Sequence, residues 1–299
     1  MNNRARFGPA GTAESFASMG YKKTVQIPGY LEKFGLGAYE YQCGHGLKAN
    51  FQTCEQLGQL CRQADIRISL HTPYYISLSS AEQEKRDNSI AYLLESARVV
   101  TALGGERMVV HSGSCGKMPR EDALALAKDT LARAQAVLDE NGFPSVRICP
   151  ETMGKMNQLG TLEEVMELCL VDERFLPCID FGHLNARTLG GIQTQADFAA
   201  ILDTIENRLG SERLQQFHSH FSQIEYTEKG GEKRHLNFGN GLFGPEYEPL
   251  AELIARKSLT PVMICESAGR QTEDAAAMQA FYRNALAPAE NDAGVGAGQ

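Results

Sequence analysis

The stretch Cys178-Ile179-Asp180-Phe181-Gly182-His183 places a carboxylate and an imidazole at the end of an apolar run. Such a run is typical of a buried β-strand. Two ionisable groups at its exit are costly to desolvate unless a proton, a hydrogen bond or a metal ion stabilises them. A lone Asp-His pair that orients a loop would also satisfy this need. The metal interpretation is favoured because the rest of the chain repeats the pattern.

Strand-like runs alternate with amphipathic helical stretches along nearly the whole chain, which favours parallel β-α-β units. Eight such runs occur, at residues 5–9, 38–43, 66–71, 108–112, 146–151, 176–181, 216–221 and 262–266. The clearest helical stretch runs from Ala123 to Leu138 and stops before Asn141-Gly142. The alternation predicts an α/β fold, a closed (β/α)8 TIM barrel forming a single domain over residues 1–286. The Ala- and Gly-rich tail, residues 287–299, is predicted to be disordered.

Composition excludes several other classes of protein. With 42% hydrophobic and 22% charged residues the chain is typical of a soluble globular protein. It has no apolar run of membrane-spanning length and no signal-peptide core at its start, so we expect a cytoplasmic protein without a membrane partner. Eight cysteines without CxxC spacing indicate reduced thiols. No glycine-rich fingerprint follows the first strand, so no nucleotide cofactor is expected.

Metal-capable side chains close six consecutive strand-like runs. They are His71, His111, Glu151, Asp180 with His183, His218 with His220, and Glu266. A seventh position, His235, follows in a long loop. In a barrel these strand ends share one face, so we expect the side chains to meet in one pocket. The mixed nitrogen and oxygen donors suit zinc or manganese.

These positions carry a family resemblance. The segments His71-Thr72-Pro73-Tyr74, His111-Ser112-Gly113-Ser114, Pro150-Glu151-Thr152, Cys178 to His183, and Glu266 resemble, in order and spacing, the motifs of the endonuclease IV family of apurinic/apyrimidinic endonucleases. That family lies within the xylose-isomerase-like TIM barrel superfamily. The likeness runs from about residue 66 to 267. It implies DNA with abasic sites as substrate, and cleavage of the phosphodiester on their 5′ side by a metal-bound hydroxide.

The resemblance also implies the roles of individual residues. It assigns His71, His111 and Glu151 to one zinc ion, Glu151, Asp180, His218 and Glu266 to a second, and His183 and His235 to a third. The bound hydroxide would attack the phosphorus in line, and the third ion would stabilise the departing oxygen. Glu151 and Glu266 are expected to be catalytic. Tyr74 and Arg234 are expected to contact the substrate.

Two positions depart from the family pattern. Lys233 stands two residues before His235, where the third site normally has an aspartate, and a protonated amine cannot ligate a metal. Glu232, Glu225 or His220 could supply the missing ligand, or the protein could hold only two ions. The early segment from Tyr39 to Lys48, which includes His45, does not resemble the family's DNA-probing loop.

These departures leave two other functions open. One is a sugar or sugar-phosphate isomerase or epimerase, which needs one divalent ion and a carboxylate pair for proton transfer, here Glu151 and Glu266. The other is a barrel that has lost catalysis and only binds a ligand. The number of metal ions per chain would distinguish the three hypotheses.

Overall fold

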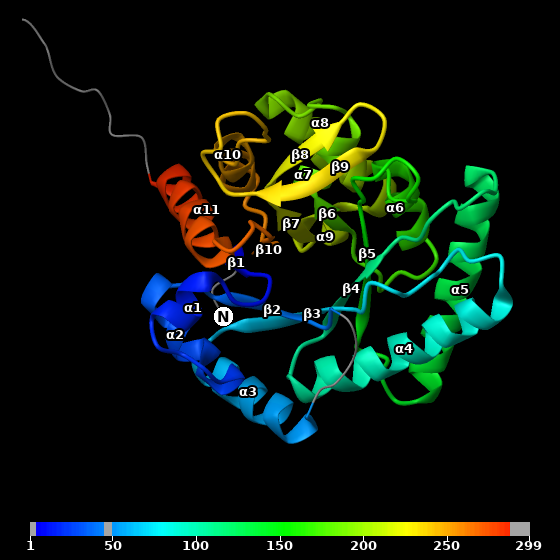
Figure 1. Ribbon diagram of the computed structural model, residues 1–299, viewed down its shortest axis with the longest axis horizontal. Helices are drawn as coiled ribbons and strands as arrows, with labels where there is room; N and C mark the ends of the chain where they lie inside the picture. Colours follow the sequence, from blue (N-terminus) through cyan, green and yellow to red (C-terminus); the bar gives the residue numbers. More distant parts are fainter. Residues whose placement is uncertain (1–3, 45–49, 288–299) are drawn as a thin grey trace, which may run out of the picture.

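Eight parallel strands surround the centre of the molecule in a computed structural model that describes residues 4–44 and 50–287 (Figure 1). The strand order is β1-β10-β7-β6-β5-β4-β3-β2. The strands are β1 (Arg6–Pro9), β2 (Ala38–Gln42), β3 (Arg67–His71), β4 (Arg107–His111), β5 (Arg147–Glu151), β6 (Cys178–Asp180), β7 (His218–Phe221) and β10 (Val262–Cys265). A parallel bridge from Ala10 to Glu40 joins the two ends of the sheet. The nearly closed barrel confirms the predicted (β/α)8 TIM barrel of one domain.

Helices follow the strands and cover the outside of the barrel (Figure 1). They are α1 (Glu14–Ser18), the 3-10 helix η1 (Thr24–Gln26), α2 (Ile27–Phe34), α3 (Phe51–Gln63), α4 (Gln83–Ala102), α5 (Arg120–Glu140), α6 (Leu162–Cys169), α7 (Phe181–Arg187), α8 (Gln195–Leu209), α9 (Ser211–Gln215), α10 (Glu248–Arg256) and α11 (Gln271–Leu286). Helix α5 is longer than predicted at both ends, and Glu121 and Asp122 favour its earlier start because they lie in the first turn.

The two faces of each strand pack into different regions, because successive side chains alternate. Outward residues such as Leu70, Val110 and Ile148 join the main core between sheet and helices. Inward residues form two small apolar clusters inside the barrel, one of Val109, Cys149, Leu176 and Cys178, the other of Ala38, Val262 and Ile264. At Gly8 a Cβ atom would lie 1.8 Å from the carbonyl oxygen of Ala38, so glycine allows β1 and β2 to approach.

The predicted long loop after β7 instead contains an antiparallel hairpin of β8 (Gln223–Thr227) and β9 (Gly231–Leu236). Its turn is anchored on the β5–α6 connection, where the Glu232 amide donates to the carbonyl of Gly154 at 3.2 Å. Gly231 has a φ of 72°, and a Cβ there would lie 2.2 Å from the same carbonyl oxygen. The hairpin lies in front of β6 and β7 in Figure 1.

Other predictions fall partly outside the described residues. His45 and Lys48 of the early segment, and residues 288–299 of the tail, belong to that remainder. All eight cysteines are buried and free. Within residues 4–44 and 50–287 no helix combines the length and the apolar character needed to span a bilayer.

Candidate metal centre

Metal-capable side chains at the carboxyl ends of the barrel strands gather around one cavity of about 270 Å³. His71, His111, Glu151 and Glu266 line it together with His183, while Asp180 and His220 lie behind Glu151 and Glu266. Neighbouring strands place them in register: His111 of β4 is paired with Glu151 of β5, and Asp180 of β6 with His220 of β7. His71 ends β3 and Glu266 directly follows β10. The convergence predicted from the strand ends is therefore present in the fold.

Glu151 is the centre of this arrangement. Its Oε2 lies 3.4 Å from His71 Nε2 and 3.6 Å from His111 Nε2. Its Oε1 lies 3.0 Å from His220 Nδ1 and 3.4 Å from His183 Nδ1. The side chain is buried, and Oε2 has no hydrogen-bond partner among the described residues. One carboxylate that faces four imidazoles in this way can bridge two metal ions.

A second group combines Glu151, Asp180, His220 and Glu266, with ligand atoms all within 4.8 Å of one another. Asp180 Oδ1 caps α7 by accepting from the His183 amide at 2.7 Å. Its Oδ2 is buried, accepts no hydrogen bond within the described part of the chain, and lies 3.2 Å from His183 Nδ1. Burying a carboxylate oxygen without a hydrogen bond is costly, and a divalent cation would reduce that cost. The donor set therefore fits a metal ion.

A third group lies between α7 and the hairpin and consists of His183, Glu232 and His235. His183 Nε2 is 3.4 Å from Glu232 Oε2, and the His183 and His235 rings lie 5.4 Å apart. Glu232 thus occupies the carboxylate position for which Lys233 is unsuited. This is one of the substitutes that the sequence left open.

A β-bulge explains why Glu232 can take this position. Glu225 pairs with Arg234 and Tyr226 with Glu232, so Lys233 is an extra residue in β9. One extra residue reverses the alternation of faces. Glu232 and His235, three positions apart, therefore reach the same group.

The outer nitrogens of three imidazoles are fixed by hydrogen bonds to main-chain or hydroxyl groups. The pairs are His71 Nδ1 with Thr72 O at 2.9 Å, His183 Nδ1 with Thr152 O at 2.9 Å, and His235 Nδ1 with Ser222 Oγ at 2.8 Å. A carbonyl can only accept, so the Nδ1 atoms of His71 and His183 carry the hydrogen. Their Nε2 atoms are then free to ligate a metal, as in other metal sites.

Electrostatics divide the imidazoles into two kinds. Burial lowers the pKa of His111 to about 3, so this ring is neutral at pH 7. Burial acts in the same direction on His71 and His183, but nearby carboxylates outweigh it. Glu151 raises the pKa of His71 to about 9, and Asp180 with Glu151 raises the pKa of His183 to about 10. A metal ion must displace protons from these two rings to bind.

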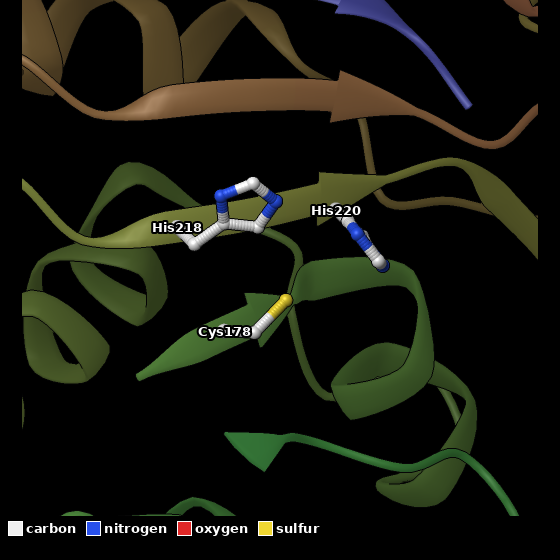
Figure 2. A group of neighbouring side chains, drawn as sticks. All are labelled: Cys178, His218 and His220. Carbon is white, nitrogen blue, oxygen red and sulfur yellow. The ribbon is translucent and has the colours of Figure 1, made fainter. Parts of the chain in front are cut away.

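The position of His218 corrects the predicted ligand set. Both His218 and His220 point into the barrel from β7, but His218 lies one layer deeper, level with Cys178 of β6 (Figure 2). Its Nε2 contacts Glu40 Oε2 at 2.9 Å and the ring is fully buried. The imidazole beside Asp180 and Glu266 is that of His220, which the sequence analysis named only as a substitute ligand.

The two predicted substrate residues differ in position. Tyr74 lines the cavity and its side chain is 53% exposed at the rim. Arg234 is turned toward Glu225, with Nε 2.6 Å from Oε2, and Lys233 Nζ lies 2.5 Å from Oε1 of the same carboxylate. The sequence analysis did not predict a role for Glu40. A glutamate at a buried position of strand β2 is the sequence feature that could have indicated one.

Comparisons with known proteins agree with this architecture. Residues 28–285 match the sequence model of the xylose isomerase-like TIM barrel family. The chain is 35% identical over 237 residues to the uncharacterized protein MJ0133 of Methanocaldococcus jannaschii, covering 79% of this chain and 84% of that protein. It is 29% identical over 203 residues to a probable endonuclease 4 of Mycoplasma pneumoniae, covering 65% of each.

A solved structure shows the same fold. The crystal structure of a D-tagatose 3-epimerase-like protein superposes with a TM-score of 0.69 at 16% identity, covering 94% of this chain and 98% of that one. At this identity the likeness concerns the fold alone. The profile match extends over most of the sequence, and the chain belongs to the xylose isomerase-like TIM barrel family.

Proposed function

We propose that this protein is a metal-dependent phosphodiester hydrolase of the endonuclease IV type that cleaves DNA on the 5′ side of abasic sites. The observation that carries the proposal is the convergence of three ligand groups on one cavity, two of which share Glu151. Similarity to a probable endonuclease 4 supports the same substrate class. An isomerase of the kind considered above needs only one of these groups.

In this proposal each ligand group holds one divalent ion. The first comprises His71, His111 and Glu151, because both Nε2 atoms lie 3.4 and 3.6 Å from Glu151 Oε2. The second comprises Glu151, Asp180, His220 and Glu266, and the third His183, Glu232 and His235. Zinc suits these nitrogen and oxygen donors, and manganese fits them as well. When bound, such ions polarise a phosphate and activate water. If only the first two groups bind metal, the protein holds two ions.

The protein's own residues would shape the site around the scissile phosphate. The two proposed catalytic carboxylates, Glu151 and Glu266, orient the ligand rings that face them. Lys155 lines the cavity and adds a positive charge that a phosphate can approach. The exposed ring of Tyr74 offers a stacking surface to a base or sugar at the rim.

Incubation with a duplex that contains one abasic site tests the proposal. Zinc-loaded protein is expected to nick the labelled strand on the 5′ side of that site. Glu151→Gln should abolish nicking, because a neutral amide cannot bridge two cations. Glu163→Gln, an exposed change on α6, is the matched control. A folded, zinc-loaded protein that leaves the duplex intact would contradict the proposal.

One observation favours a sugar or sugar-phosphate isomerase or epimerase as second candidate. Glu151 Oε1 and Glu266 Oε2 lie 3.0 and 3.5 Å from the same atom, His220 Nδ1, so two carboxylates flank one position. The cavity of about 270 Å³ has the size of a small-ligand site. Deuterium uptake from solvent into ketoses or their phosphates would reveal such proton transfer. One ion per chain together with deuterium uptake would support this candidate. Bound ions with neither nicking of the duplex nor deuterium uptake would indicate a binding protein.

A further inference from the structure

A second polar layer lies beneath the candidate metal ligands, in the middle of the barrel. Its central residue is Glu40 of β2, which is fully buried. Ser69 Oγ and His218 Nε2 each lie 2.9 Å from Glu40 Oε2, and Gln42 Nε2 donates to Oε1 at 3.2 Å. A carboxylate in this position is expensive to bury, so the side chains around it are arranged to hold its charge.

Glu40 also faces one of the candidate metal ligands. Its Oε1 lies 2.9 Å from His220 Nε2, an ion-pair contact that does not have the angle of a hydrogen bond. The other ring nitrogen, His220 Nδ1, points the opposite way, 3.0 Å from Glu151 Oε1 and 3.5 Å from Glu266 Oε2. Beside the Glu40 oxygen the favoured state of Nε2 is N–H, which leaves the Nδ1 lone pair directed at the upper group.

We infer that Glu40 is a positioning residue, which sets the orientation and tautomer of His220 so that Nδ1 can ligate a metal ion. Ser69 and His218 hold the carboxylate of Glu40 in place. The inference rests on the proposed function in one respect, that an ion binds at His220. Carboxylates that accept the outer N–H of a ligating histidine typically contribute about 10–100-fold to metal affinity.

The same geometry argues against another ion in the deeper layer. Cys178, His218 and His220 offer ligand atoms within 4.8 Å of one another (Figure 2). An ion bound through His218 Nε2 would displace the contact of that atom with Glu40 and would compete for the ring of His220. This layer is therefore expected to be hydrogen-bonded and metal-free.

Zinc affinity measured by competition with a chelator tests the role of Glu40. Glu40→Gln preserves size but removes the charge, and it should weaken one zinc ion per chain by about 10–100-fold. Ser69→Ala is the matched control, because it removes one hydrogen bond to the same carboxylate and leaves the charge in place. A folded Glu40→Gln protein with wild-type affinity for every ion would overturn the inference.

A measurement on the unaltered protein makes the test independent of how the variant folds. In zinc-loaded wild-type protein with ¹⁵N-labelled histidine, His220 should show a protonated Nε2 and a metal-bound Nδ1. A metal-bound Nε2 would overturn the inference. If the wild-type protein binds no zinc, both the proposed function and this inference are wrong. Zinc bound at His220 with unchanged affinity in Glu40→Gln would remove this inference alone.

Discussion

His218 and His220 share a strand and a face, yet they have different surroundings. His220 lies level with Asp180 at the mouth of the barrel, and His218 lies level with Cys178 inside it. Two residues along a strand move a side chain by nearly 7 Å. This distance separates a side chain that can reach the candidate metals from one that supports Glu40.

Substitution of each histidine by asparagine tests this difference. His220→Asn should lose at least one zinc ion per chain, because the second ligand group loses its imidazole nitrogen. His218→Asn should keep the wild-type number of ions at saturating zinc, since its Nε2 contacts Glu40 and its ring lies outside the second ligand group. Elemental analysis after gel filtration gives both counts. Equal losses in the two variants would contradict the assignment.

Protonation of His71 and His183 predicts how metal binding depends on pH. Their raised pKa values, about 9 and about 10, mean that both rings are protonated on both nitrogens, and so are cationic, at pH 7.5 in the metal-free protein. Zinc must displace these protons, so its affinity should rise with pH from 6.5 toward 9. Calorimetry in buffers of different ionisation enthalpy should show release of one to two protons per chain at pH 7.5. Binding without proton release would contradict this charge assignment.

At the scale of elements, the β8–β9 hairpin completes the third ligand group. Its bulge at Lys233 and its anchor on Gly154 direct Glu232 toward His183. Lys233 and Arg234 instead pair with Glu225 on the neighbouring strand. Thus the basic residues that interrupt the family pattern lie outside the ligand group.

Glu232→Gln should remove one zinc ion while the other ions remain, because the amide lacks the negative charge of the third group. Lys233→Gln, the adjacent change in the same bulge, should leave the metal count unchanged. Metal titration followed by elemental analysis distinguishes the variants. Loss of an ion in Lys233→Gln, or no loss in Glu232→Gln, would assign the third group differently.

Helix α6 begins with a capping box, directly after the β5–α6 connection on which the hairpin is anchored. Glu164 N donates to Thr161 Oγ1 at 3.2 Å, and Thr161 N donates to Glu164 Oε2 at 2.9 Å. Thr161→Ala removes one half of the box and should lower the free energy of unfolding by about 1 kcal/mol. Urea denaturation of the zinc-loaded protein measures the change. Thr204→Ala, at an exposed site in α8, is a control that is expected to have a smaller effect.

At the scale of the whole molecule, the candidate centre connects strands that are far apart in the sequence. The ligands His71 and Glu266 stand on β3 and directly after β10. Bound ions would therefore cross-link both halves of the barrel, while the helices outside need no metal to pack.

Metal removal should lower thermal stability without unfolding the barrel. Zinc at a free concentration of 100 times its dissociation constant adds about 2.7 kcal/mol per independent site. Chelation should therefore lower the melting temperature and keep the far-UV circular dichroism of the folded protein at 25 °C. Differential scanning calorimetry with and without chelator measures this shift. An unchanged melting temperature would contradict tight metal binding.

By itself the sequence determined the barrel and most of its mouth. Apolar runs and the polar residues that end them are local features, so His71, His111, Glu151, Asp180 and Glu266 could be placed at strand ends before any contact was known. The parallel barrel then required these ends to meet. Ligand candidates that are far apart in the sequence still meet, because all the parallel strands end at the same face of the barrel.

Only the tertiary structure decided which of two inward residues lies beside Asp180 and Glu266. The depth of His218 and His220 depends on the stagger between β6 and β7, and no local pattern contains that stagger. The contact of Glu40 with His218, across 178 positions of sequence, arises because the barrel closes. The site of Glu232 depends on a bulge set by pairing with β8. In each case the deciding interaction is between strands, which is why it appears only in the folded chain.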